Sequence, residues 1–190
     1  MFLIVGLGNP GKFYKNNRHN IGFKIIDNIR DTYNFPGFSK KFKSEISKSE
    51  FEKKLVFLLK PTTFMNNSGI ALREIRDFYN ININNIYVIH DEIDLDQGRV
   101  KVKIGGGHNG HNGLKSIDKL IGKNYNRVRV GVSRPSKIYE ENVDENISNW
   151  VLSDFTSNEK DQWLDNTINY VSEMIISLIN SQNGFCDKNV

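Results

Sequence analysis

A histidine in a polar loop is the strongest candidate for chemistry in this sequence. His19 lies in the polar run of residues 12–20, which follows the apolar segment FLIVG and a glycine-rich turn. Asp91 ends a second apolar segment, IYVIHD. An unperturbed imidazole has a pKa near 6.5, which suits proton abstraction at neutral pH, and a carboxylate can orient the ring and stabilise the imidazolium that forms. The two residues predict a general base with an orienting partner.

Water is the expected nucleophile for such a base. No serine stands in a G-x-S-x-G turn, and the single cysteine, Cys186, lies far along the chain from these loops. A covalent acyl-enzyme is therefore not expected. The alternative is that His19 only forms a hydrogen bond in a surface loop.

Three asparagines, Asn9, Asn66 and Asn112, lie in three separate polar loops. Each carboxamide can donate to a carbonyl and accept from an amide N–H, which suits a bound peptide or a developing oxyanion. Asparagine is also favoured in turns and at helix caps. Turn chemistry is therefore an equal alternative for these residues.

The glycines at positions 6, 8 and 11 match the G-x-G-x-x-G spacing of a dinucleotide-binding turn after a strand. In that fold the helix opens within the turn, so that its first amides face the pyrophosphate. Here Pro10 and the polar residues 12–20 intervene before the next apolar periodicity. We expect the turn to display polar side chains instead, with dinucleotide binding as the weaker alternative.

A metal site is a further alternative. His90 and Asp91 precede the loop GGGHNGHNG, which contains His108 and His111. Such residues can bind zinc, but these histidines lie in a glycine-rich loop without a second H-x-x-x-H or a cysteine pair. We expect no metal and no cofactor.

Basic residues alternate along two predicted strands, as Lys101 and Lys103 in RVKVKI and as Arg127 and Arg129 in RVRVGV. A period of two places each pair on one face of a strand. Neighbouring strands would join the pairs into a phosphate-binding patch, although a solvated sheet face is an equal alternative.

The charge is distributed unevenly along the 190 residues. Residues 140–190 hold ten of the 22 acidic residues but two of the 26 basic ones. The basic remainder predicts a polyanionic partner, above all nucleic acid, with a solvated basic surface as an equal alternative. The mean hydropathy of -0.49 and the lack of a long apolar run argue against a membrane protein. The single cysteine favours a reducing cytoplasm.

Apolar periodicity predicts an α/β domain in which a twisted mixed sheet is flanked by helices, spanning residues 1–190 as one unit. Asn20 and Ser68 are candidate helix N-caps, and Asn112-Gly113 leads into another helix. Residues 134–149 are polar and predict a long loop or mobile cover. Strands are predicted at 2–6, 44–50, 53–59, 85–90, 99–104 and 127–133, and helices at 20–33, 67–79, 113–121 and, acidic in character, 158–180. Because ligands bind outside the carboxyl ends of strands in such sheets, the polar loops should converge on one crevice.

Taken together, these segments resemble bacterial-type peptidyl-tRNA hydrolases. The resemblance is carried, in order, by GLGNPG, RHNIG, KPTTFMNNSG, HDEIDLDQGRVKVKIGGGHNGHNGLKSI and NYNRVRVGVSRP. A weaker similarity extends to NWVLSDFTSNE. It implies a phosphorylase/hydrolase-like α/β domain, usually monomeric. The implied reaction is hydrolysis of the ester between a peptide and the 3' end of tRNA, which recycles tRNA during translation. A tRNA-binding protein without catalysis is the remaining alternative.

The resemblance also implies roles for residues at matching positions. His19 would be the general base and Asp91 its orienting carboxylate, with Asn9 completing the catalytic set. A second set would bind the peptidyl group, namely Tyr14, Met65, Asn66, His111 and Asn112. Lys103 and Arg129 would bind the 5' phosphate of tRNA, flanked by Lys101 and Arg127. The implied partner is the acceptor end of peptidyl-tRNA, and no metal is implied.

Overall fold

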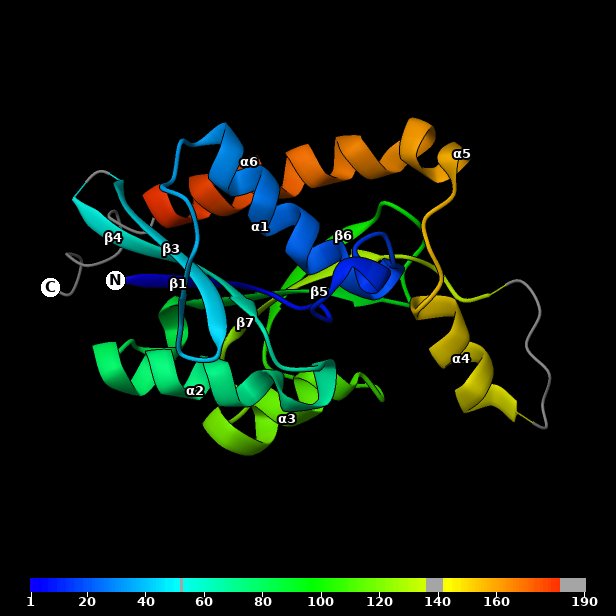
Figure 1. Ribbon diagram of the computed structural model, residues 1–190, viewed down its shortest axis with the longest axis horizontal. Coiled ribbons are helices and arrows are strands. Elements are labelled where there is room, and N and C mark those ends of the chain that lie inside the picture. The colour runs from blue at the N-terminus through cyan, green and yellow to red at the C-terminus, as the bar shows by residue number, and fades with distance from the viewer. Residues whose placement is uncertain (52, 136–141, 182–190) are drawn as a thin grey trace, which may run out of the picture.

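Seven strands form one mixed sheet between two pairs of helices (Figure 1). The structure, a computed structural model, describes residues 1–51, 53–135 and 142–181. The sheet order is β2-β3-β4-β1-β5-β7-β6, in which β4, β1, β5 and β7 are parallel and the outer strands are antiparallel. The strands are β1 (Phe2–Gly6), β2 (Ser39–Lys41), β3 (Ser44–Phe51), β4 (Lys54–Pro61), β5 (Ile86–Glu92), β6 (Val100–Ile104) and β7 (Asn126–Gly131). The predicted α/β class is confirmed.

Helices cover both faces of this sheet. On one face lie α1 (Ile21–Thr32) and α6 (Asp165–Ser181), and on the other lie α2 (Ser68–Tyr79) and α3 (Asn112–Ile121). Side chains of β1 alternate between these layers, so that Ile4 packs beneath α1 and α6 whereas Leu3 and Val5 pack beneath α2 and α3. This two-sided burial explains why the central strands are continuous apolar runs. No helix in the described ranges combines the length and apolar character that a membrane span requires.

The largest difference from the predicted elements is α4 (Val143–Val151). A loop is predicted there, and this prediction is wrong from residue 143 onward. The helix has Asp144 and Glu145 in its first turn, where acidic side chains complement the helix dipole, and an apolar face formed by Val143, Ile147 and Val151 at intervals of four. Residues 136–141 of the predicted cover lie outside the described residues, and the mobility of the cover stays a prediction.

Two further differences concern short elements. The exposed edge strand β2 is not predicted, because its three residues carry no apolar alternation. The predicted helix at 158–180 begins as α5 (Ser157–Glu159), passes through a π-helical turn (Lys160–Leu164) and continues as α6. Thr156 and Glu159 form a reciprocal capping box at its start.

The glycine turn after β1 serves close packing of the backbone. A Cβ atom added at Gly6 would lie 2.3 Å from the carbonyl oxygen of Gly22, and one added at Gly22 would lie 2.4 Å from the backbone nitrogen of Leu7. The helix α1 begins only after two 3-10 turns, η1 (Lys12–Tyr14) and η2 (Arg18–Asn20). The helix therefore does not begin within the glycine turn, as a dinucleotide-binding site requires. The turn instead brings η2 to the carboxyl edge of the sheet.

Candidate active site

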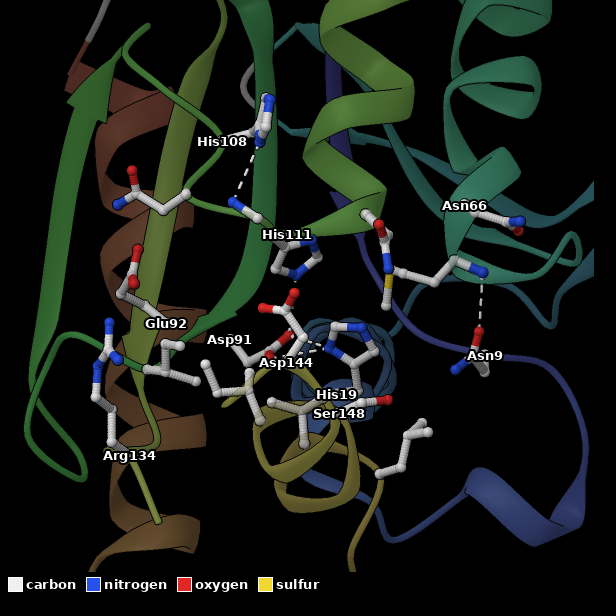
Figure 2. A pocket seen from close by; sticks show the side chains of 18 of the residues that line it. Asn9, His19, Asn66, Asp91, Glu92, His108, His111, Arg134, Asp144 and Ser148 are labelled. Atoms are coloured by element: carbon white, nitrogen blue, oxygen red, sulfur yellow. Dashed lines mark hydrogen bonds and ion pairs between the residues drawn. The ribbon is translucent and has the colours of Figure 1, made fainter. Parts of the chain in front are cut away.

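A pocket of about 600 Å³ opens at the carboxyl edge of the parallel strands (Figure 2). Asn9 reaches it from the loop after β1, Met65 and Asn66 from the loop after β4, and Asp91 from the end of β5. His111 and Asn112 enter from the start of α3, and α4 forms the facing wall. The predicted convergence of polar loops on one crevice is found.

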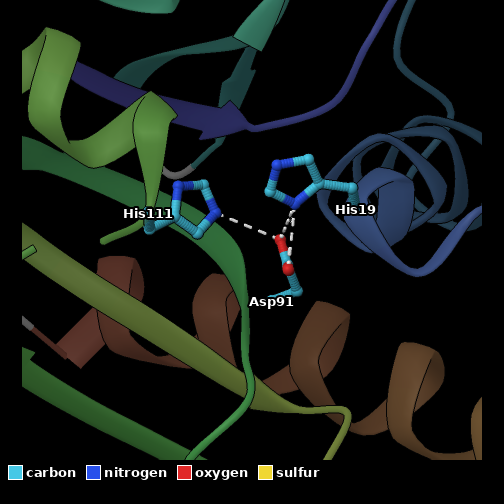
Figure 3. Close-up of side chains that lie close together, drawn as sticks. All are labelled: His19, Asp91 and His111. Carbon is cyan, nitrogen blue, oxygen red and sulfur yellow. Dashed lines mark hydrogen bonds and ion pairs between the residues drawn. The ribbon is translucent and has the colours of Figure 1, made fainter. Parts of the chain in front are cut away.

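Two histidines share one carboxylate at the base of this pocket. His19 Nδ1 lies 2.8 Å and 2.9 Å from the two carboxylate oxygens of Asp91, and His111 Nε2 lies 3.1 Å from Oδ1. Figure 3 shows the carboxylate between the two rings. The contact between His19 and Asp91 is the one that the sequence predicts, whereas the second contact, from His111, is not.

The hydrogen bonds assign a tautomer to each ring. His111 Nδ1 accepts from the backbone amides of Gly113 and Leu114 at 3.1 Å and 3.4 Å, so its proton resides on Nε2 and is donated to Asp91. His19 likewise donates its Nδ1 proton to Asp91. The lone pair of His19 is therefore on Nε2, the ring nitrogen that does not contact Asp91.

Asp91 is ionised in this environment. It is buried, and burial alone would raise its pKa. The adjacent His19 and His111 outweigh burial and hold the pKa of Asp91 well below its ordinary value. A carboxylate in contact with Nδ1 is the arrangement that stabilises the protonated form of an imidazole.

The donor arrangement favours hydrogen bonding over metal binding. Ligand atoms of His19, Asp91 and His111 lie within 4.8 Å of one another. However, His111 Nε2 carries a proton because two amides occupy Nδ1, so it offers no lone pair to a metal. His90, another residue of the zinc alternative, is buried and donates Nδ1–H to the carbonyl of Asp91, and burial together with the nearby His111 lowers its pKa to about 3.

Asn9 is fixed so that one polar group remains for a ligand. Its backbone exchanges two hydrogen bonds with the side chain of Asn20, at 2.8 Å and 2.9 Å. Its side-chain oxygen accepts from the backbone amide of Met65 at 2.8 Å. The amide hydrogens of Asn9 are thereby left to donate, as an oxyanion requires. Asn20 is the residue before α1, as predicted, but its side chain binds Asn9 rather than the helix amides.

The other predicted peptide-binding residues occupy different depths. Asn66 and Asn112 line the pocket and are exposed at its mouth, whereas Met65 is buried against the start of α3. Tyr14 does not line the pocket. Its ring packs edge-on against Phe64, 6.4 Å between centroids, and Phe64 lines the pocket.

The four basic residues of β6 and β7 share a face, but they do not form one patch. Lys101 pairs with Arg129 and Lys103 with Arg127 across the two strands. Arg127 is fully buried, where it binds Asp118 of α3 at 2.8 Å and the carbonyl of Gly107 at 2.7 Å.

The prediction that Arg127 binds phosphate is therefore wrong. Strand alternation indicates a face, but α3 covers the part of this face that carries Arg127, so the guanidinium anchors the glycine-rich loop instead. Arg129 is half-buried, with Nε on Glu92 at 3.0 Å, and Lys101 is exposed. Lys103 lies against Gly106, where an added Cβ would come within 2.7 Å of its Nζ.

Fold and site together define an α/β protein with a His–Asp pair in a pocket at the carboxyl edge of a mixed sheet. Comparison with known proteins specifies it further. The family model for peptidyl-tRNA hydrolase matches residues 3–188. The chain therefore belongs to the peptidyl-tRNA hydrolase family, and the resemblance, enzyme class and reaction expected from the sequence are confirmed.

Individual relatives agree with this membership. The peptidyl-tRNA hydrolase of Bartonella henselae is 49% identical over 94% of this chain and 89% of its own length. That of Rickettsia canadensis is 49% identical over 84% of this chain and 83% of its own. The crystal structure of peptidyl-tRNA hydrolase from Acinetobacter baumannii superposes with a TM-score of 0.87, at 36% identity, over 97% of this chain and 91% of that one.

Proposed function

We propose that this enzyme cleaves peptidyl-tRNA with a water molecule that His19 activates and Asp91 orients. His19 Nε2 takes a proton from water as the water oxygen attacks the ester carbonyl carbon. The tetrahedral intermediate collapses when the bond to the ribose oxygen breaks, and His19 returns the proton to that oxygen. The observation that carries the proposal is the contact of a buried, ionised Asp91 with Nδ1 of His19, which leaves Nε2 free.

Asn9 is proposed to donate to the oxyanion, because its side-chain oxygen is already bound to the amide of Met65. Asn66 and Asn112, at the mouth of the pocket, are proposed to bind the peptide main chain. Met65 shapes the floor, Tyr14 supports Phe64 at the rim, and His111 holds Asp91. An ester needs little help for its leaving group, so one base with oxyanion donors suffices.

Lys103 and Arg129 are proposed to bind the 5' phosphate of tRNA, with Lys101 nearby. The exposure of Lys101 and the partial exposure of Lys103 and Arg129 support this role. Contacts to phosphate carry no sequence information, which suits an enzyme that acts on many tRNAs. A monomer without a cofactor, acting in the cytoplasm, is the form of the enzyme that we propose.

The direct test compares two substrates of the purified enzyme. We expect rapid release of tRNA from N-acyl-aminoacyl-tRNA and at least about tenfold slower release from aminoacyl-tRNA, because a carboxamide oxygen that accepts from a neutral peptide N–H binds a hydrated ammonium less well. Release is measured with a label on the aminoacyl group, which precipitates in acid only while it is attached to tRNA. Equal rates would contradict the proposed recognition, and tight tRNA binding without cleavage would favour a binding protein.

The phosphate site has its own test. Lys103→Ala should raise KM about tenfold with kcat unchanged, since one phosphate contact is lost in both ground and transition states. The slope of log KM against log salt should fall by about one. Lys48→Ala is the matched control, because Lys48 is an exposed lysine of β3, near the opposite edge of the sheet. An unchanged KM in Lys103→Ala would place the phosphate elsewhere.

A further inference from the structure

Arg18, the residue before His19, is buried among groups of the C-terminal part of the chain. It is 2% exposed. Its Nη1 donates to the hydroxyl of Ser153 at 2.7 Å and to the carbonyl of Asp154 at 2.9 Å, and its Nη2 donates to Glu159 at 2.6 Å. The guanidinium carbon lies 3.7 Å from the ring centroid of Trp150. One side chain thus connects the turn of His19 to the end of α4, to the segment that follows α4 and to the last residue of α5.

Main-chain contacts reinforce this connection. The backbone amide of Arg18 donates to Ser153 at 3.1 Å, and that of Phe155 donates to Asn16 at 3.0 Å. Asn17 forms a bridge with Asp154. The turn that carries His19 and the segment after α4 therefore form a short antiparallel pair.

The helix held by this connection is the wall of the pocket. Ile147, Ser148 and Val151 of α4 line the pocket opposite the catalytic loops, and Figure 2 shows α4 beside His19. Trp150 also donates its indole N–H to the carbonyl of Ser133 at 2.8 Å. The indole is thus held between Arg18 and the segment that follows β7, and this fixes the last turn of α4.

We propose that Arg18 is a positioning residue that holds α4 as the pocket wall in a fixed relation to His19. The inference rests on the proposed role of His19 as the base. Arginine is required because its planar fork reaches several oxygens at once while its face stacks on an indole, whereas a lysine ammonium is a compact charge that cannot do both. With the wall displaced, the acyl group loses its alignment with the water on His19, and misplacement by about 1 Å costs catalysis up to about 100-fold.

The test replaces Arg18 by lysine in a Trp163→Phe background, in which Trp150 is the only tryptophan. We expect kcat to fall about 10- to 100-fold while the Kd for deacylated tRNA is unchanged. Trp150 fluorescence should shift to longer wavelength and become more accessible to acrylamide. Arg30→Lys is the matched control, because Arg30 pairs with Asp31 on an exposed surface of α1.

A second variant tests whether a loss of kcat could result from misfolding rather than from displacement of α4. Glu159→Gln retains Arg18 and its stack on Trp150 but removes the charge partner, so we expect a smaller loss of kcat and native Trp150 fluorescence. Unchanged kcat and unchanged quenching in Arg18→Lys would overturn the proposal, as would a lower melting temperature with native kcat per folded molecule. Retained turnover in His19→Ala would show that His19 is not the base. Acrylamide quenching of Trp150 would still report whether Arg18 holds α4, so the two proposals can fail separately.

Discussion

Replacement of His19 by alanine is expected to lower kcat by about 100- to 10,000-fold, the usual contribution of a positioned general base. Water bound without Nε2 has no acceptor for its proton as it attacks. The affinity for tRNA should not change, because the proposed phosphate contacts are made by residues of β6 and β7 and not by residues of η2. Single-turnover hydrolysis and tRNA binding, measured separately, distinguish these effects.

A suitable control lies in the same polar run. Lys15→Ala removes an exposed side chain that does not line the pocket and should retain kcat. Wild-type turnover in His19→Ala would show that another group activates the water. Loss of tRNA binding in that variant would show that His19 acts in recognition rather than in chemistry.

Asp91→Asn should lower kcat by about 1,000- to 10,000-fold, the upper part of the range expected for His19→Ala. The reason lies in the tautomers. His111 must keep its Nε2 proton, because the amides of Gly113 and Leu114 occupy Nδ1. It therefore takes the oxygen of the introduced carboxamide as its acceptor, and His19 meets the amide hydrogens instead. His19 then turns to the tautomer with its proton on Nε2 and is no longer a base.

The loss caused by Asp91→Asn should not change with pH over the range in which the wild-type base is fully deprotonated. The two imidazoles hold the pKa of Asp91 well below its ordinary value, so the carboxylate is protonated only in strong acid. Asp91 is therefore ionised at any pH suitable for the assay. Rates at two pH values on the upper plateau of the wild-type pH–rate profile, where the base is fully deprotonated, should show the same ratio of variant to wild type. Asp77→Asn, at an exposed site of α2, is the control. A ratio that changed about tenfold between these conditions would contradict a permanently charged Asp91.

The sequence predicts the central architecture and the contact between His19 and Asp91 for one reason. Buried parallel strands are apolar runs, and their polar successors meet at one edge of the sheet. His19 and Asp91 therefore come together although they are far apart in the chain. The confirmed sheet, with its helices on both faces, follows from the same patterns.

What the sequence does not reveal depends on packing between distant segments. Strand alternation places Arg127 and Arg129 on one face, but only the position of α3 decides that Arg127 is buried on Asp118. The contacts of Arg18 with Trp150 and Glu159 span more than a hundred residues and have no local pattern. The apolar face of α4, at intervals of four, is the one signal that could have revealed the pocket wall.

The hydrogen bonds from α3 to His111 have a consequence for how the site tolerates change. The groups that fix the His111 tautomer, and through Asp91 the orientation of His19, are main-chain amides. A side-chain substitution does not remove a main-chain amide unless it introduces proline. The ring nitrogen that His19 turns toward Asp91 is thus set by the path of the backbone, and that path depends on Gly113, where an added Cβ would come within 2.6 Å of the sulfur of Met65.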